Sequence, residues 1–139
     1  MTNLSVVVDK LIRMHQYITE LQALKPESYQ QYNADHKTRY AVERVMQLVV
    51  DLALDVNNLL LAHYQRPPAS DYYNSFIDLS ECDVFEIQFA LAIAPSIGLR
   101  NRLVHEYEEI NDKVVYDSID VMVDMYNQYM ENVNDILNQ

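Results

Sequence analysis

The chain has 139 residues, of which half are apolar, one is glycine and four are proline, and its formal net charge is −11. That length corresponds to one domain, residues 1–139, with a single buried core, and the hydrophobic content excludes a disordered chain. The scarcity of turn residues excludes a many-stranded sheet and favours long helices with few connections. The acidic balance excludes a protein that coats nucleic acid nonspecifically, because such proteins have basic surfaces.

Cysteine content and hydropathy favour a soluble protein of a reducing compartment. Cys82 is the only cysteine, so an intramolecular disulfide is impossible. The N-terminus has no basic segment ahead of its short valine run, which argues against a signal peptide. No apolar stretch is expected to approach the ~20 residues that a membrane span requires. We therefore expect a cytoplasmic protein with no membrane partner.

The negative charge is concentrated towards the C-terminus. Between Leu103 and Gln139, nine acidic residues are accompanied by a single basic residue, Lys113. This concentration can keep the protein soluble, or it can bind a basic protein partner. Both interpretations remain open.

The first predicted element is an amphipathic helix. Apolar residues recur at intervals of three and four from Leu4 to Leu24, which is the spacing of one helical face. Pro26 interrupts this pattern, and residues 27–31 can form a short helical turn after it.

A longer helix follows. Asn33 or Asp35 can cap its N-terminus, and its apolar periodicity continues to about Tyr64. The segment Arg66–Ala69 contains two consecutive prolines, neither of which can donate a helical hydrogen bond. The chain should therefore break there.

Shorter helices are predicted after this break. Ser70 or Asp71 can cap the first of them, and a second is expected to begin near Asp83. Pro95 and Gly98 should bend or restart the second helix. A final long helix begins near Asp112. Together these elements predict an all-α, up-and-down helical bundle of four to five helices.

The segment from Arg100 to Tyr107 gathers two guanidinium groups, an imidazole and a phenol. Cleavage of RNA beside a 2′-hydroxyl needs a base for that proton and an acid for the leaving oxygen, and imidazole can serve as either. A guanidinium stabilises the negative charge that develops on the phosphoryl oxygens. These residue types therefore suit RNA cleavage without a metal or another cofactor. The alternative is an ordinary helix surface.

Helix geometry constrains how these side chains can meet. At about 100° per residue, Arg100 and Tyr107 lie nearly on one face, whereas Arg100 and His105 are separated by about 140°. The helix can end near His105, the long side chains can converge, or a second copy of the chain can complete the cleft. We favour the last two together, because arginine side chains are long and a twofold dimer brings two such segments together.

The stretch Gly98–Tyr107 resembles the RxxxxHxY signature of the HEPN superfamily. It is most similar to that of HepT-like toxins, which are paired with minimal nucleotidyltransferase antitoxins (MntA). The likeness continues at Asp55-Val56, at Pro68 with Ser70–Tyr73, and at Ile110 and Val115-Tyr116.

The resemblance implies a HEPN-like bundle that forms a homodimer with the motif at its interface. It implies a metal-independent endoribonuclease in which Arg100 and His105 are the catalytic pair and RNA is the substrate. An MntA-like nucleotidyltransferase would transfer AMP from ATP to Tyr107 and so neutralise the toxin. Asn101 and Arg102 would support an RNA phosphate or the dimer contact.

Two aspartates on the long helix, Asp51 and Asp55, are weaker candidates. Their four-residue spacing can bind a metal, but no histidine joins them, and a solvated stripe is the favoured interpretation. The resemblance implies that a polar residue of this helix faces the motif, and we rank Asp55 above Asp51 for that role.

Further side chains could assist RNA binding. Lys37, Arg39 and Arg44 can widen a basic entrance, or they can be ordinary surface charge. The tyrosines can stack on bases, although packing is the favoured use; those considered are Tyr72, Tyr73, Tyr126 and Tyr129.

Two other functions remain. The chain can be a binding module that accepts AMP on Tyr107 with little nuclease turnover, which the acidic C-terminal part favours. It can also be a helical oligomerisation protein in which Arg100 and His105 affect stability alone.

Overall fold

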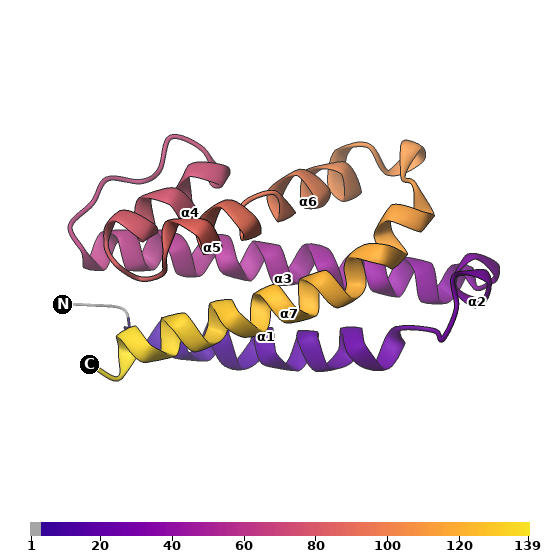
Figure 1. The fold of residues 1–139 in the computed structure, drawn as a ribbon, viewed down its shortest axis with the longest axis horizontal. Coiled ribbons are helices and arrows are strands. Elements are labelled where there is room, and N and C mark those ends of the chain that lie inside the picture. Colours follow the sequence, from indigo (N-terminus) through magenta and orange to yellow (C-terminus); the bar gives the residue numbers. More distant parts are fainter. Residues whose placement is uncertain (1–3) are drawn as a thin grey trace.

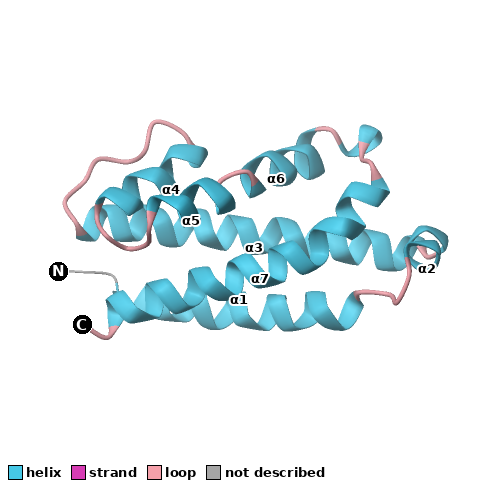
Figure 2. Cartoon of the chain, viewed as in Figure 1, coloured by secondary structure: helices cyan, strands magenta, loops and turns pink. Residues whose placement is uncertain are grey.

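The computed structural model describes residues 4–139, with the exception of the Tyr107 side chain. Three long helices form most of the fold: α1 (Leu4–Leu24), α3 (His36–His63) and α7 (Asp112–Leu137). The shorter elements are α2 (Tyr29–Ala34), α4 (Tyr72–Glu81), α5 (Ile87–Ile93), α6 (Ser96–His105) and the 3-10 turn η1 (Tyr107–Glu109). No strand occurs within residues 4–139, and Figure 2 shows only helices and connecting loops there. The predicted all-α fold is confirmed.

The helices form an up-and-down bundle around α3. In Figure 1, α1 and α7 lie along one side of α3, and α4, α5 and α6 cover the other side. α5 and α6 follow one another in nearly the same direction, and the chain then turns back into α7. The start of α1 and the end of α7 lie at the same end of the bundle.

The long helices begin and end close to where the sequence predicts. Asp35 caps α3, since its side chain accepts hydrogen bonds from the backbone N–H groups of Lys37 and Thr38. Asp71 caps α4 in the same way, by accepting from the Asn74 N–H. These contacts satisfy backbone donors that have no partner within the helix.

The shorter elements differ from the prediction in two places. Between Leu4 and Gln139 the chain has more than the expected four to five helices, because α2 is a full helix and Pro95 separates α5 from α6. The second helix after the break was expected from Asp83, but α5 begins at Ile87. Asp83 has a φ of 62°, which ends the preceding turn, and the chain is extended at Glu86 before α5 starts.

The core is continuous and rich in tyrosine. Tyr32, Tyr126, Tyr129 and Phe76 are its largest fully buried side chains. Tyr126 and Tyr129 therefore pack inside the fold, and the suggestion that they stack on RNA bases is wrong. Tyr72 and Tyr73 are exposed.

The expectation that no segment approaches a membrane span is wrong for α3. This helix is long and apolar enough to cross a membrane by length and composition, with a mean hydropathy of 1.5 over its most apolar window. However, 56% of that window is buried inside the bundle. This burial is what a core helix requires, and it accounts for the apolar composition of α3.

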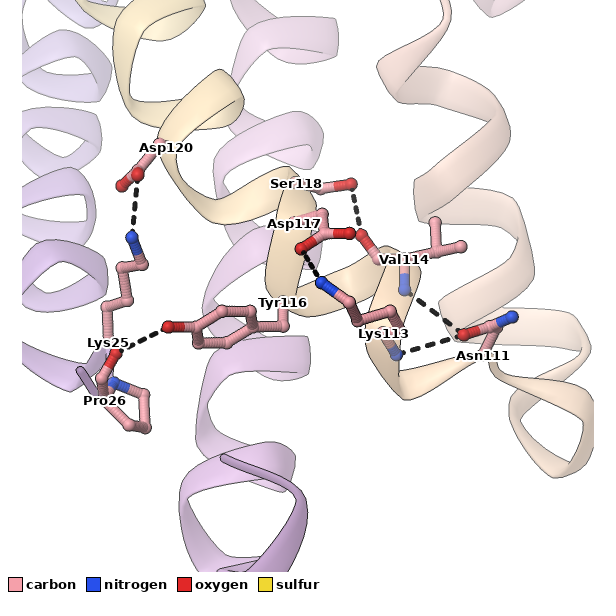
Figure 3. A network of polar contacts seen from close by, with 9 residues as sticks. All are labelled: Lys25, Pro26, Asn111, Lys113, Val114, Tyr116, Asp117, Ser118 and Asp120. Carbon is pink, nitrogen blue, oxygen red and sulfur yellow. Dashed lines mark hydrogen bonds and ion pairs between the residues drawn. The ribbon is translucent and has the colours of Figure 1, made fainter. Parts of the chain in front are cut away.

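The start of α7 is tied to the connection between α1 and α2 (Figure 3). The Tyr116 hydroxyl donates to the Pro26 carbonyl oxygen at 2.9 Å, and Lys25 Nζ lies 2.7 Å from Asp120 Oδ2. The Asn111 side chain caps α7 by accepting from two backbone N–H groups. These contacts fix the beginning of α7 directly after η1, and so they position the segment that follows α6.

Candidate functional site

α6 presents the motif on the surface because its opposite side is buried. Ile97, Leu99 and Leu103 face the core, and the Ser96 hydroxyl lies 2.7 Å from the buried Tyr126 hydroxyl. Pro95 stands at the start of α6. Its missing N–H removes no helical hydrogen bond, since the first N–H groups of a helix have no partner within it. The polar residues of α6 are thereby directed towards α3 and solvent.

Arg100 is held against α3. Its Nε donates to Oδ1 of Asp51 at 2.8 Å, and its Nη1 donates to Oδ1 of Asn101 at 3.2 Å. The Arg100 side chain is 18% exposed and that of Asp51 is 34% exposed. The guanidinium is therefore partly buried, paired with a carboxylate and oriented by two acceptors.

Asp55 does not face the motif, contrary to the ranking from sequence. Its Oδ2 lies 3.1 Å from Lys10 Nζ on α1, and its side chain is 58% exposed. Four residues advance a helix by about 40° beyond a full turn, and this rotation directs Asp55 towards α1 while Asp51 meets α6. The sequence interpretation of Asp51 as part of a solvated stripe missed this contact.

The motif helix ends at His105. The Glu106 N–H still donates to the Arg102 carbonyl oxygen at 2.9 Å, and the chain then enters η1. Of the three geometries considered from sequence, an early helix end is thus present, although the other two were favoured. Arg100 and Tyr107 consequently do not lie on one continuous helix. The Tyr107 side chain lies outside the described part of the structure.

His105 is exposed beside an open depression. This depression has a volume of about 520 Å³ and is lined by His105, Glu106, Glu108 and Glu109. The imidazole is thus accessible from solvent, and three glutamates line the same depression. Their negative charge opposes binding of a polyanion at this point.

A second, smaller cavity is lined by residues of α6, η1 and the start of α7. It has a volume of about 160 Å³. Its walls are mostly apolar; the lining residues are Leu99, Arg102, Leu103, Glu109, Ile110, Asn111, Val114 and Val115. No sequence pattern indicates this cavity, because its lining comes from α6, η1 and the start of α7, which only the fold brings together.

The three basic residues considered as an RNA entrance are not equivalent. Arg39 pairs with Asp112 at the start of α7, with 3.5 Å between Nε and Oδ2, and also binds the Asn33 carbonyl oxygen. Lys37 and Arg44 are exposed. Within the described residues, no group of three or more His, Cys, Asp or Glu side chains is arranged to hold a metal ion.

Comparison with known proteins identifies relatives over nearly the whole chain. The family described as Ribonuclease HepT-like matches residues 14–133. The chain is 30% identical to the tRNA nuclease HepT of Aphanizomenon flos-aquae over 139 residues, which cover 99% of this chain and 95% of that protein.

Two solved structures share the fold. One is a toxin–antitoxin complex with AMP-PNP, with a TM-score of 0.87 and 18% identity, covering 94% of this chain and 98% of that one. The other is a tri-AMPylated HEPN toxin of Shewanella oneidensis in complex with its MNT antitoxin, with a TM-score of 0.86 and 18% identity, covering 97% and 99%. At these identities the likeness establishes a common fold.

Proposed function

The chain belongs to the HepT-like ribonuclease family, and from this premise we propose that it is the toxin of a toxin–antitoxin pair. In this proposal it is a metal-independent endoribonuclease that acts in the cytoplasm. Its RxxxxHxY motif extends from Arg100 to Tyr107. The observation that carries the proposal is an oriented guanidinium at Arg100 on the same short helix as an exposed imidazole at His105.

The proposed reaction uses the 2′-hydroxyl of RNA as the nucleophile. One imidazole removes the 2′-hydroxyl proton, the 2′-oxygen forms a bond to phosphorus, and the bond from phosphorus to the 5′-oxygen breaks. A second imidazole donates a proton to the leaving 5′-oxygen, so the products are a 2′,3′-cyclic phosphate and a 5′-hydroxyl. Arg100 stabilises the negative charge on the phosphoryl oxygens in the transition state.

A homodimer supplies the second imidazole. Exposed apolar side chains occur on the helices before and after α6 in the chain: Ile87 and Leu91 on α5, and Val114 and Val121 on α7. Such side chains favour burial against another protein surface. A twofold axis near α6 would bring the two His105 residues together and provide one base and one acid. Asn101 and Arg102 would then contact RNA phosphate or the second protomer.

Neutralisation is proposed to occur through Tyr107. An MntA-like nucleotidyltransferase would transfer AMP from ATP to the Tyr107 hydroxyl, in keeping with the tri-AMPylated state of the Shewanella oneidensis toxin. The phenolic oxygen would lose its proton and form a bond to the α-phosphorus, the bond between the α- and β-phosphates would break, and pyrophosphate would leave. Because Tyr107 follows the end of α6 by two residues, an anionic adduct there can bind Arg100 and His105 and exclude RNA.

Cleavage in the presence of EDTA tests the nuclease. Unmodified protein is incubated with RNA and excess EDTA, beside His105→Ala and the surface control Glu20→Ala. We expect cleavage by the wild type and by Glu20→Ala, and a loss of at least about 100-fold in His105→Ala, because general acid–base catalysis contributes about 10²- to 10⁴-fold. Equal cleavage by wild type and His105→Ala would remove the role of His105.

A second candidate function is an AMP-accepting module with little nuclease turnover. The exposed carboxylates of Glu106, Glu108 and Glu109 favour it, since they suit a basic protein partner better than RNA. Wild type and Tyr107→Phe are incubated with the cognate transferase and ATP, and their masses are compared. An adduct that persists in Tyr107→Phe would exclude Tyr107 as the sole acceptor.

A further inference from the structure

The contact between Asp51 and Arg100 suggests a role for Asp51 that the motif does not include. We propose that Asp51 is a positioning residue, which holds Arg100 so that the outer edge of its guanidinium faces the scissile phosphate. This inference rests on the proposed ribonuclease function. It concerns a residue of α3, 49 positions before Arg100 in the chain.

The hydrogen bonds divide the guanidinium into an occupied and a free part. Nε donates to Asp51 Oδ1 at 2.8 Å, and Nη1 donates to Asn101 Oδ1 at 3.2 Å. Nη2 makes no hydrogen bond with any side chain that the structure describes. A guanidinium has five N–H donors in a fixed plane, so anchoring Nε leaves donors on Nη1 and Nη2 for phosphate oxygens. Anchoring also fixes the plane in which they point.

The position of Asp51 on α3 restricts the movement of the Asp51–Arg100 pair. Asp51 lies near the middle of α3, a helix of 28 residues that packs on both sides of the bundle. With the Arg100 side chain 18% exposed and Asp51 34% exposed, the pair is partly shielded from water, which strengthens a charge-assisted hydrogen bond. A long arginine that would otherwise sample several rotamers is thereby held in one orientation before RNA binds.

The same helix provides a matched control. Asp55 is the next acidic residue on α3 and also forms an ion pair, but its partner is Lys10 on α1. Substitution at either position removes one negative charge from α3 and breaks one ion pair. Only substitution at Asp51 releases Arg100.

The experiment compares Asp51→Ala with Asp55→Ala in single-turnover RNA cleavage. We expect Asp55→Ala to cleave at the wild-type rate and Asp51→Ala to cleave about 10- to 100-fold more slowly, because a misplaced group of this kind costs up to about 10²-fold. The loss should fall on the cleavage rate constant more than on RNA affinity. Asp51→Asn should recover part of the rate, since its amide oxygen can still accept from Nε.

A double-mutant cycle separates positioning from a general effect of charge or stability. If Asp51 acts through Arg100, Asp51→Ala should have no further effect in protein that carries Arg100→Ala. Thermal unfolding of each variant shows whether the fold is kept, and the Arg100 Nε–H signal in NMR should lose its protection from exchange in Asp51→Ala alone.

The outcomes distinguish this inference from the proposed function. Cleavage by Asp51→Ala at the rate of Asp55→Ala, with an active wild type, would overturn the positioning role and leave the ribonuclease in place. Equal losses from Asp51→Ala with and without Arg100 would overturn it as well. A wild type that cleaves no RNA would refute the function itself, and the role of Asp51 with it.

Discussion

Two tyrosines of the core differ in what their hydroxyl groups contact. The Tyr129 hydroxyl donates to Asn57 Oδ1 at 2.5 Å, and Asn57 Nδ2 donates in turn to Ser75 Oγ at 2.9 Å. The Tyr32 hydroxyl is buried and has no hydrogen-bond partner among the described residues. A buried polar group without a partner reduces stability, whereas a satisfied one contributes to it.

Substitution by phenylalanine should therefore have opposite effects at these two positions. Tyr129→Phe leaves the buried Asn57 oxygen without its donor and should lower the free energy of unfolding by about 1–3 kcal/mol. Tyr32→Phe removes an unsatisfied hydroxyl and should leave stability unchanged or raise it. Urea unfolding at neutral pH measures both. Equal destabilisation by the two substitutions would contradict the assigned contacts.

Glu43 provides a prediction that depends on pH. Partial burial raises the pKa of its carboxyl group, the nearby Asp112 carboxylate raises it further, and Arg39 opposes the rise. A carboxyl whose pKa is higher in the folded than in the unfolded state favours folding while both states are protonated. That contribution is lost as the pH rises through the folded-state pKa.

Glu43→Gln should consequently be more stable than the wild type at pH 7. The difference should disappear below about pH 4, the ordinary pKa of glutamate, where the wild-type side chain is neutral in both states. Chemical unfolding at pH 7 and pH 3 provides the comparison. A gain in stability of equal size at both pH values would show that ionisation of Glu43 is not its cause.

At the scale of single residues, the sequence identifies the motif but not its partner on α3. Periodicity places Asp51 and Asp55 on neighbouring parts of one helix surface, and nothing in that pattern shows whether α1 or α6 covers each part. The packing of the bundle determines which helix covers each part: Asp55 pairs with Lys10 of α1, and Asp51 pairs with Arg100 of α6. Such a choice depends on tertiary contacts between residues far apart in the chain.

Among the elements, the first turns of α7 depend on contacts with the α1–α2 connection (Figure 3). Tyr116 is partly buried, packs against the rings of Tyr29 and Tyr32, and donates to the Pro26 carbonyl oxygen. The neighbouring pair of Lys25 and Asp120 is more open to solvent, with the Asp120 side chain 71% exposed. Exposed ion pairs contribute little to stability.

Tyr116→Phe should therefore lower the stability of the fold more than Asp120→Asn does, although each removes one polar contact of this network. We expect Tyr116→Phe to lower the free energy of unfolding by about 1 kcal/mol, and Asp120→Asn to change it hardly at all. Thermal or urea unfolding of the two variants tests this order. A larger loss in Asp120→Asn would mean that the ion pair, and not the tyrosine, holds the start of α7.

The elements also show where periodicity is sufficient and where it is not. α1, α3 and α7 are predicted because each repeats an apolar face over several turns and is stopped by proline or begun by a capping side chain. Val84 and Phe85 extend an apparent helical pattern, yet they are buried in the turn that precedes α5. Burial explains their apolar character without any helix, so the sequence pattern placed the start of α5 too early.

For the whole molecule, the proposed use of one His105 as base and the other as acid has a consequence for mixed dimers. If each cleft needs one His105 as base and the other as acid, a dimer of one wild-type and one His105→Ala protomer is inactive. If each protomer carries an independent site, the same mixed dimer keeps half of its activity. The two arrangements predict different activities for mixtures of known composition.

Wild type and His105→Ala are unfolded together in equal amounts, refolded so that protomers combine at random, and assayed for RNA cleavage. Activities are compared with that of the same total amount of wild type refolded alone. A shared cleft should retain about one quarter of that activity, because about one quarter of the dimers then contain two wild-type protomers. Independent sites should retain about one half. Refolding of wild type with Glu20→Ala, which lies on the exposed surface of α1, controls for losses in the procedure. Activity near one half would refute the shared cleft, since His105 of a single protomer would then suffice for both proton transfers.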